Sequence, residues 1–217
     1  LGDVTANSLV IEANELDIDS NLTSLVNASV TANSIHHSGE LFSQGVLTIH
    51  VKDSLRNQGQ LVANSLSIKG DETASTRLDN HSGVMIGGSK LSIEDLSEFD
   101  NRYGQLYLNG TESETPLFID ASVIQNDHGQ IASETDMRLE MKTVRNHDGL
   151  LAAAGGIHSV LPGSLLDNSQ GQLFSGSDVH LQSLTNSQGL FQAGSLKIES
   201  AGDLRNDHGH IELSDAS

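Results

Sequence analysis

The sequence repeats one short pattern, apolar-x-Asn-x-x-Gly-x-apolar, and this repetition restricts the possible folds more than any other feature. The pattern occurs three times in succession near the end of the chain, at residues 166–173, 184–191 and 204–211, and earlier copies can be followed upstream. Successive copies are about 20 residues apart, a period typical of solenoid proteins. In a solenoid each repeat packs only against its neighbours. The chain is therefore expected to form a stack of similar coils and not a single globular core.

The Asn and Gly of each copy are expected to form a corner of the coil. The expected corner residues are Asn57 and Gly59, Asn80 and Gly83, Asn101 and Gly104, Asn126 and Gly129, Asn146 and Gly149, Asn168 and Gly171, Asn186 and Gly189, and Asn206 and Gly209. His37 stands where an earlier corner Asn would fall, and the turns that end at Gly39 and Gly59 are one residue shorter, which predicts a different turn there. Gly adopts positive φ without steric cost, and Asn tolerates the left-handed conformation. Stacked Asn side chains are also expected to form a hydrogen-bonded amide ladder.

Apolar residues flank every corner in the same way. Two positions before each corner Asn and two positions after each Gly the residue is apolar in every copy, as at Leu166 and Leu173. Four positions after the Gly the residue is mostly small, as at Ser175, and a second apolar-x-apolar pair follows, as at Val179 and Leu181. Alternation with a period of two indicates β-strands. We therefore expect an all-β parallel coil with about three short strands per turn, roughly ten turns and no helix.

Two intervals between the expected strands are too long for the repeat. Extra chain falls at residues 70–76 and 109–116, which are polar, acidic and rich in turn-forming residues, and a smaller irregularity falls at Leu161–Ser164. Insertions in solenoids map to surface loops and often to the binding face. The candidate partner-facing residues are Asp71, Glu72, Thr73, Thr111, Glu112 and Glu114. We expect one β-helical domain over residues 1–217, irregular over 1–34 and regular over 35–213, and a fragment of a longer filament.

Composition excludes several classes of function. The net charge is −18, with 11 Lys and Arg against 29 Asp and Glu, so no nucleic-acid partner is expected. The chain has no Cys, which excludes disulfides and thiol chemistry. No apolar run is long enough to cross a bilayer, so no membrane insertion of this segment is expected. Aromatic residues make up only 3% of the chain, which suits a core of stacked aliphatic residues.

The repeats resemble those of filamentous haemagglutinin. The segment Leu184–Ile198 carries Leu-x-Asn-x-x-Gly followed by Ala-Gly-Ser-Leu-x-Ile, and the resemblance extends over about residues 35–213. It implies a right-handed parallel β-helix at the surface of a Gram-negative bacterium or outside the cell. It also implies an outer-membrane two-partner-secretion transporter during export, and a virulence role as an adhesin or as the stalk that delivers a contact-dependent growth inhibition toxin. A target-cell receptor, either protein or glycan, would be the second partner.

The remaining chemistry of the sequence leaves one alternative open. Several His residues lie beside Asp in the corner turns, as in Asp127-His128 and His147-Asp148, and such pairs are candidate metal ligands. Because other copies carry Ser-Gln there, we interpret these positions as variable surface turns and expect no cofactor or metal.

Parallel β-helices also include polysaccharide lyases and glycosidases, whose sites gather carboxylates on one face. Candidate pairs such as Glu94 and Asp95 are scattered along this chain, so we expect a protein that is not an enzyme, with a carbohydrate-active enzyme as the alternative.

Overall fold

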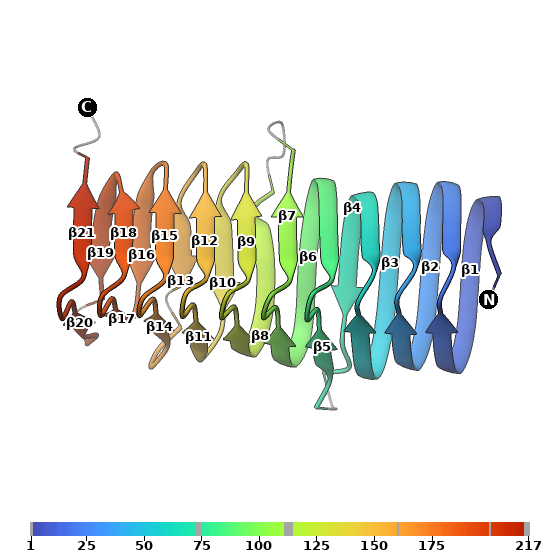
Figure 1. Ribbon diagram of the computed structural model, residues 1–217, viewed down its shortest axis with the longest axis horizontal. Coiled ribbons are helices and arrows are strands. Elements are labelled where there is room, and N and C mark those ends of the chain that lie inside the picture. Colours follow the sequence, from blue (N-terminus) through green and yellow to red (C-terminus); the bar gives the residue numbers. More distant parts are fainter. Residues whose placement is uncertain (1, 73–74, 111–114, 160, 200, 215–217) are drawn as a thin grey trace.

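The structure, a computed structural model, describes residues 2–72, 75–110, 115–159, 161–199 and 201–214. Over these residues the chain winds as a right-handed parallel β-helix of about ten turns, with roughly 20 residues per turn (Figure 1). The first and last strands, β1 and β21, lie at opposite ends of the rod, and none of the elements assigned in the described ranges is a helix. The expected fold class is confirmed.

All of the described regular elements are strands of one continuous sheet. They are β1 (Val4–Ile18), β2 (Asn21–His37), β3 (Glu40–Asn57), β4 (Gln60–Lys69), β5 (Arg77–Asp79), β6 (Val84–Asp100), β7 (Gln105–Leu108), β8 (Leu117–Gln125), β9 (Gln130–Ser133), β10 (Met137–Glu140), β11 (Thr143–Arg145), β12 (Leu150–Ala153), β13 (Ile157–Ser159), β14 (Leu165–Asp167), β15 (Gln172–Ser175), β16 (Asp178–Leu181), β17 (Leu184–Thr185), β18 (Leu190–Ala193), β19 (Ser195–Ile198), β20 (Leu204–Arg205) and β21 (His210–Leu213).

Each coil pairs in parallel with the coils before and after it, and equivalent residues lie directly above one another. Leu9 pairs with Ala28, Ala28 with Leu47, and Leu47 with Leu66, so β1 and β2 share the register of the later coils although they lack the Asn corner. The three strand segments of a coil run together in β1, β2 and β3, which have 15, 17 and 18 residues. From β9 onward they are separated into strands of two to four residues.

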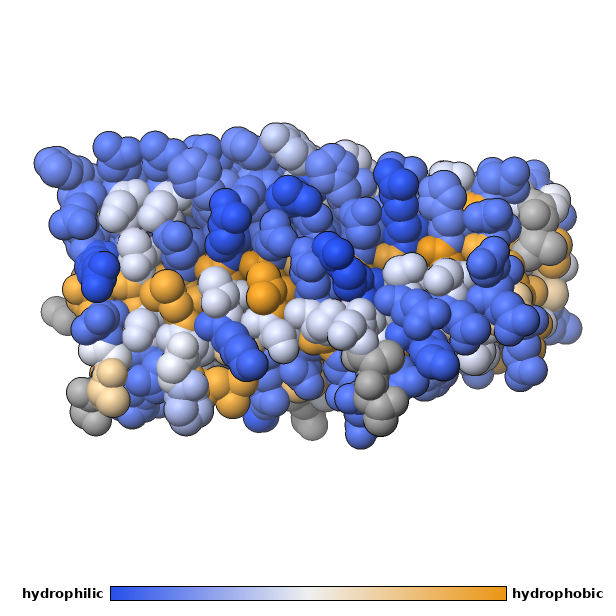
Figure 2. Space-filling view, turned by 90° about the horizontal axis from the view of Figure 1, so that it is seen from below, coloured by the Kyte–Doolittle hydropathy of each residue, from blue (hydrophilic) through white to orange (hydrophobic). Residues whose placement is uncertain are grey.

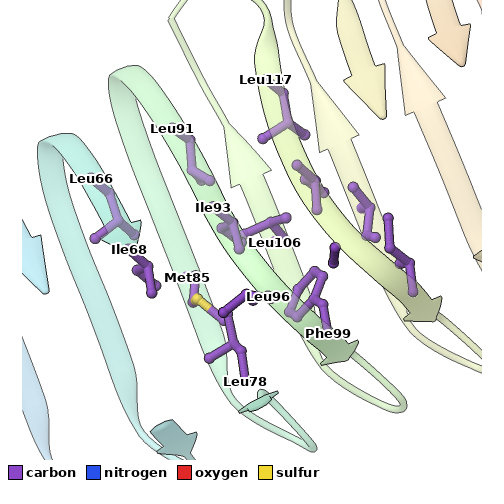
Figure 3. Packing of buried hydrophobic residues seen from close by; sticks show 14 of the residues in the cluster. Leu66, Ile68, Leu78, Met85, Leu91, Ile93, Leu96, Phe99, Leu106 and Leu117 are labelled. Carbon is purple, nitrogen blue, oxygen red and sulfur yellow. The ribbon is translucent and has the colours of Figure 1, made fainter. Parts of the chain in front are cut away.

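The core is a column of aliphatic side chains that runs the length of the rod. Alternate residues of each strand point inward, and Figure 3 shows Leu66, Ile68, Leu91 and Ile93 side by side in consecutive coils. Like residues therefore cover like residues, and burial of apolar surface contributes about 25 cal/mol per Å². The face of the rod in Figure 2 is mostly hydrophilic, with a narrow apolar band along its length. In the described part of the chain no helix is long and apolar enough to span a membrane.

The two insertions lie where the sequence places them. One connects Lys69 at the end of β4 to Arg77 at the start of β5, and the other connects Leu108 of β7 to Leu117 of β8. Figure 1 shows these connections at opposite edges of the rod. Among the candidate partner-facing residues, Asp71 is half-buried and Glu72 is exposed. Residues Thr73, Thr111, Glu112 and Glu114 lie outside the described residues.

Candidate interaction surfaces

The corner Asn residues form the expected amide ladder, buried inside the rod. Asn57 donates its side-chain N–H to the Oδ1 of Asn80 at 2.7 Å, and Asn80 donates to Asn101 at the same distance. The series continues through Asn126, Asn146, Asn168 and Asn186 to Asn206, with Nδ2–Oδ1 distances of 2.7–2.8 Å. Every corner Asn from Asn57 to Asn186 has an exposure of 0%. The buried amides are therefore satisfied by their own equivalents in the next coil.

Each amide of the ladder also bonds to the backbone of two coils. The Nδ2 of Asn126 lies 2.7 Å from Asn146 Oδ1, 3.3 Å from the carbonyl of Gly129 and 2.9 Å from the carbonyl of Leu150. One side chain thus holds its own turn closed and joins that turn to the following coil. A buried polar group that lost these partners would carry an unfavourable desolvation free energy. The ladder therefore fixes the register between coils.

The reason for Gly at each corner differs from the expected one. In the seven full-length turns, positive φ belongs to the residue before the Gly, with φ between 52° and 62°, and neither the Gly nor the Asn has it. These residues are Ser82, Tyr103, His128, Asp148, Gln170, Gln188 and His208. The expectation of positive φ at Gly was wrong because position i+2 of the turn takes that conformation, as in a type II turn. The shorter turns at Gly39 and Gly59 have no such residue, so the expected difference between the turns is confirmed.

Gly is required at the corner because the backbones of two coils approach closely there. A Cβ atom on Gly129 would lie 2.1 Å from the carbonyl oxygen of Asn101 in the preceding coil. A Cβ on Gly171 would lie 1.9 Å from the carbonyl oxygen of Asn146. No side chain fits at these distances, so the pattern Asn-x-x-Gly records two separate constraints. Asn supplies the ladder, and Gly permits the contact between coils.

His37 begins the ladder. Its Nδ1 lies 2.7 Å from Asn57 Oδ1, and because an amide oxygen only accepts, Nδ1 carries the proton and donates it. The residue below it in the column is Ile18, and His37 Nε2 is buried without a hydrogen-bond partner. Burial lowers the pKa of His37, and the hydrogen bond to Asn57 opposes this effect only in part. His37 is therefore held in the neutral form. His36, which precedes it, points to solvent.

The variable residues of the corner turns form an exposed ridge of rings and ion pairs. The ring of Tyr103, which is 57% exposed, stacks on His128 with centroids 4.9 Å apart and meets His81 edge-on at 5.2 Å. Arg102 bonds to Asp100 through both Nε and Nη2, at 2.9 and 2.6 Å. Burial works to raise the pKa of Asp100, but the hydrogen bonds and charge of Arg102 outweigh burial and lower it. The Arg residues beside the corners therefore pair with Asp and do not form a basic surface.

The metal interpretation of the turn His–Asp pairs gains no support. Asp148 Oδ2 lies 3.3 Å from His147 Nε2 and 4.0 Å from His128 Nδ1, both distances being those of ion pairs. Within the described ranges, no three His, Asp or Glu side chains come together in an arrangement that could hold a metal ion.

The structure brings together carboxylates that appear scattered in the sequence. Burial, and then the negative charges of Glu140, Asp95 and Glu94, raise the pKa of Asp120. A raised pKa in a cluster of carboxylates is one feature of a general acid. Glu94 and Asp95 are candidates from the sequence alone, whereas Asp120 and Glu140 are not. Asp120 and Glu140 are paired neighbours on β8 and β10, which only the register of the coils reveals.

Two recesses lie next to one another on the outer face of β8 and β10. One has a volume of about 340 Å³ and includes Glu140 and His158 in its lining, and the other has a volume of about 330 Å³ and includes Ser92 and Phe118. Pro116 and Arg138 line both. We refer to the two recesses together as the Pro116–Arg138 groove. Each recess has the volume of a small-ligand site.

Comparison with known proteins identifies the family. The model of the haemagglutinin repeat matches residues 2–95, 102–160 and 151–207. The chain therefore belongs to the haemagglutinin repeat family. No curated protein and no solved structure matches the chain. Proteins of this family are typically secreted or cell-surface adhesins, and the β-solenoid described above fits the stalk of a filamentous adhesin.

The ladder predicts a large cost for removing one internal amide. We expect Asn126→Ala to lower the free energy of unfolding by about 3 kcal/mol, because Asn146 loses its donor and two carbonyls lose a partner inside the core. Urea unfolding followed by circular dichroism measures the effect. The control is Asn109→Ala, an exposed residue directly after β7, which we expect to change stability by less than about 0.5 kcal/mol. Equal effects of the two substitutions would contradict the role of the ladder.

The position of His37 predicts a pH-dependent loss of stability. Because the pKa of His37 is lower in the folded than in the unfolded chain, its contribution is complete above the unfolded value of 6.5 and is lost as the pH falls below that value. His37→Asn should extend the amide ladder by one coil and remove this pH-dependent contribution to the free energy of unfolding. We expect the variant to gain stability relative to the parent as the pH is lowered from neutral to mildly acidic. A stability difference that does not change with pH would show that His37 is not buried as a neutral group.

Proposed function

We propose that this chain is a stalk segment of a secreted surface filament, either an adhesin or a contact-dependent growth inhibition exoprotein, and that it contributes to target-cell binding. The observation that carries the proposal is the unbroken stack of haemagglutinin repeats, whose register is fixed by the buried ladder from His37 to Asn206. Such a rod holds its two ends at a constant separation. At about 4.8 Å per coil, ten coils span on the order of 50 Å.

Export through an outer-membrane two-partner-secretion transporter follows from this assignment. The chain has no Cys that could cross-link before folding, and it has a net charge of −18 that keeps an unfolded chain soluble. The pairing of each coil with its neighbours allows folding to proceed coil by coil as the chain emerges. In this proposal the segment acts through binding and shape and not through catalysis.

Surface exposure is the first test of the proposal. Antibodies raised against the purified segment should label intact cells of the source bacterium, or the filament released from them, as strongly as permeabilised cells. Labelling that requires permeabilisation would contradict an exported filament. Degradation of an anionic polysaccharide by the segment, lost in Asp120→Asn, would instead support the alternative of a carbohydrate-active enzyme, because Asp120 is the carboxyl with the raised pKa.

We further propose that the insertions at residues 70–76 and 109–116 face the partner on the target cell. They are the segments that depart from the repeat, and insertions in solenoids commonly carry binding. Replacing each insertion with the shorter connection of a regular coil should reduce binding of the labelled segment to target cells by about tenfold or more. Phe174→Ala on β15, outside both insertions, provides the control. Unchanged binding after both replacements would eliminate the insertions as the contact.

A further inference from the structure

One outward column of side chains changes its chemistry half-way along the rod. In the first coils it consists of Ser29, Thr48, Ser67 and Ser92, which pair in register from coil to coil. The next positions of the same column are Phe118, Arg138, His158, His180 and Lys197. Small hydroxyl residues thus give way to an aromatic ring and a series of long cationic or imidazole side chains. The change begins at β8, directly after the insertion at residues 109–116.

The Pro116–Arg138 groove lies over the start of this second part of the column. Thr115 and Pro116, at the end of the insertion, line one or both recesses. Leu161, from the irregular Leu161–Ser164 turn, lines the recess nearer His158 and is 40% exposed. Two departures from the repeat that lie far apart in sequence therefore border the same groove. A regular coil has neither the insertion nor the irregular turn, so it would lack both borders of the groove.

Arg138 lines both recesses, and Phe118 lies beside it in one of them. The guanidinium carbon of Arg138 lies 5.6 Å from the centre of the Phe118 ring, which is half-buried and held in place by β8. Because the guanidinium group covers one face of this ring, the C–H groups of a ligand can pack only against the part of the ring that Arg138 leaves open, in the recess that Phe118 shares with Ser92. The guanidinium group lies over that ring and bonds to Glu140, so its orientation is fixed before a ligand arrives.

The long polar side chains of the column lie beside carboxylates. Arg138 pairs with Glu140, and His158 lies 3.6 Å from Asp178. Glu199 pairs with both His180 and Lys197, the latter at 3.3 Å. The lining of the groove carries Lys90 and Arg138 against three carboxylates, Glu94, Asp136 and Glu140, on a chain whose net charge is −18. This arrangement disfavours a polyanionic ligand and suits a neutral ligand with many groups that both donate and accept hydrogen bonds.

We propose that the Pro116–Arg138 groove binds a linear neutral oligosaccharide that lies along the rod axis. A saccharide chain presents C–H faces to Phe118 and hydroxyl groups to Arg138, Glu140 and His158. The two recesses share Pro116 and Arg138 and lie over coils that are spaced about 4.8 Å apart, so they can accept neighbouring rings of one chain. This inference rests on the proposed function in that it names a neutral glycan as the chemistry recognised on the target cell.

The experiment uses the purified segment and an array of immobilised neutral oligosaccharides of glucose, galactose and N-acetylglucosamine, with sulfated and uronic-acid oligosaccharides alongside. We expect binding to a neutral series, confirmed by calorimetric titration with the same free oligosaccharide. Phe118→Ala and Arg138→Gln should each weaken binding by about tenfold or more. Phe174→Ala is the matched control, because Phe174 is also a half-buried outward Phe but lies on β15, outside the groove lining. Circular dichroism and urea midpoints confirm that each variant folds.

Salt dependence separates the ligand classes. Neutral oligosaccharide binding should stay constant between about 50 and about 500 mM NaCl, whereas binding of a polyanion weakens as screening increases.

Absence of binding to any neutral series, binding only to anionic series, or unchanged binding in Phe118→Ala and Arg138→Gln would each overturn the proposal. Cell binding by the segment that persists in both groove variants would overturn the groove while leaving the adhesin function in place. Saccharide binding without surface labelling of the source bacterium would contradict the proposed location and leave the groove in place.

Discussion

The buried hydrogen bond between the side-chain amides of successive corner Asn residues is the interaction on which the rest of the structure depends. An amide in an apolar interior must be satisfied, and here the side-chain partner of each is the same residue of the next coil, as between Asn101 and Asn126 at 2.7 Å. The requirement passes from coil to coil, so a coil that slipped by one residue would leave polar groups unpaired and turn the core side chains outward. Register, turn and core are therefore specified together. His37 begins the series because it donates to Asn57 and leaves its other nitrogen beside the apolar column that ends at Ile18.

Because the interior and one corner fix the register, the outward positions are free to differ from coil to coil. The turn ridge around Tyr103 and the column that runs from Ser92 through Phe118 to Arg138 use positions at which other coils carry Ser, Thr or Gln. The backbone under these residues is held in every coil by the same strand pairing. A rigid support of this kind keeps a binding group in place without specific packing for each variant. The groove at Pro116 and the exposed ring of Tyr103 both belong to this variable outer layer.

The repeat predicts the fold because every copy carries the same pattern of residues. Contacts on the outer surface depend instead on which residues of neighbouring coils lie side by side, and a single copy of the repeat does not show this. The solenoid, the strands, the ladder and the positions of the insertions follow from residues that recur at equivalent positions, such as Leu166, Leu184 and Leu204. The role of Gly129 was assigned to its backbone conformation, because close approach between coils has no signal in a single copy. The neighbours of Asp120 were missed for a related reason. Glu94 and Glu140 lie about one coil away on either side, and which residues meet depends on the lengths of the insertions between them. When the outward residues of successive coils are aligned, the change from Ser92 to Phe118 stands out, and it marks the position of the groove.

The direction of the ladder has a mechanical consequence. The hydrogen bonds between coils, such as that from Asn146 to Asn168, run along the axis of the rod, whereas the covalent chain runs around it. A force that pulls the two ends apart therefore loads the bonds of the outermost coil first and detaches coils one at a time. Each coil of roughly 20 residues exchanges about 4.8 Å of rod for about 70 Å of extended polypeptide. Under tension the molecule would lengthen in steps at nearly constant force, so a filament built from such coils could limit the load transmitted to whatever it holds at its far end.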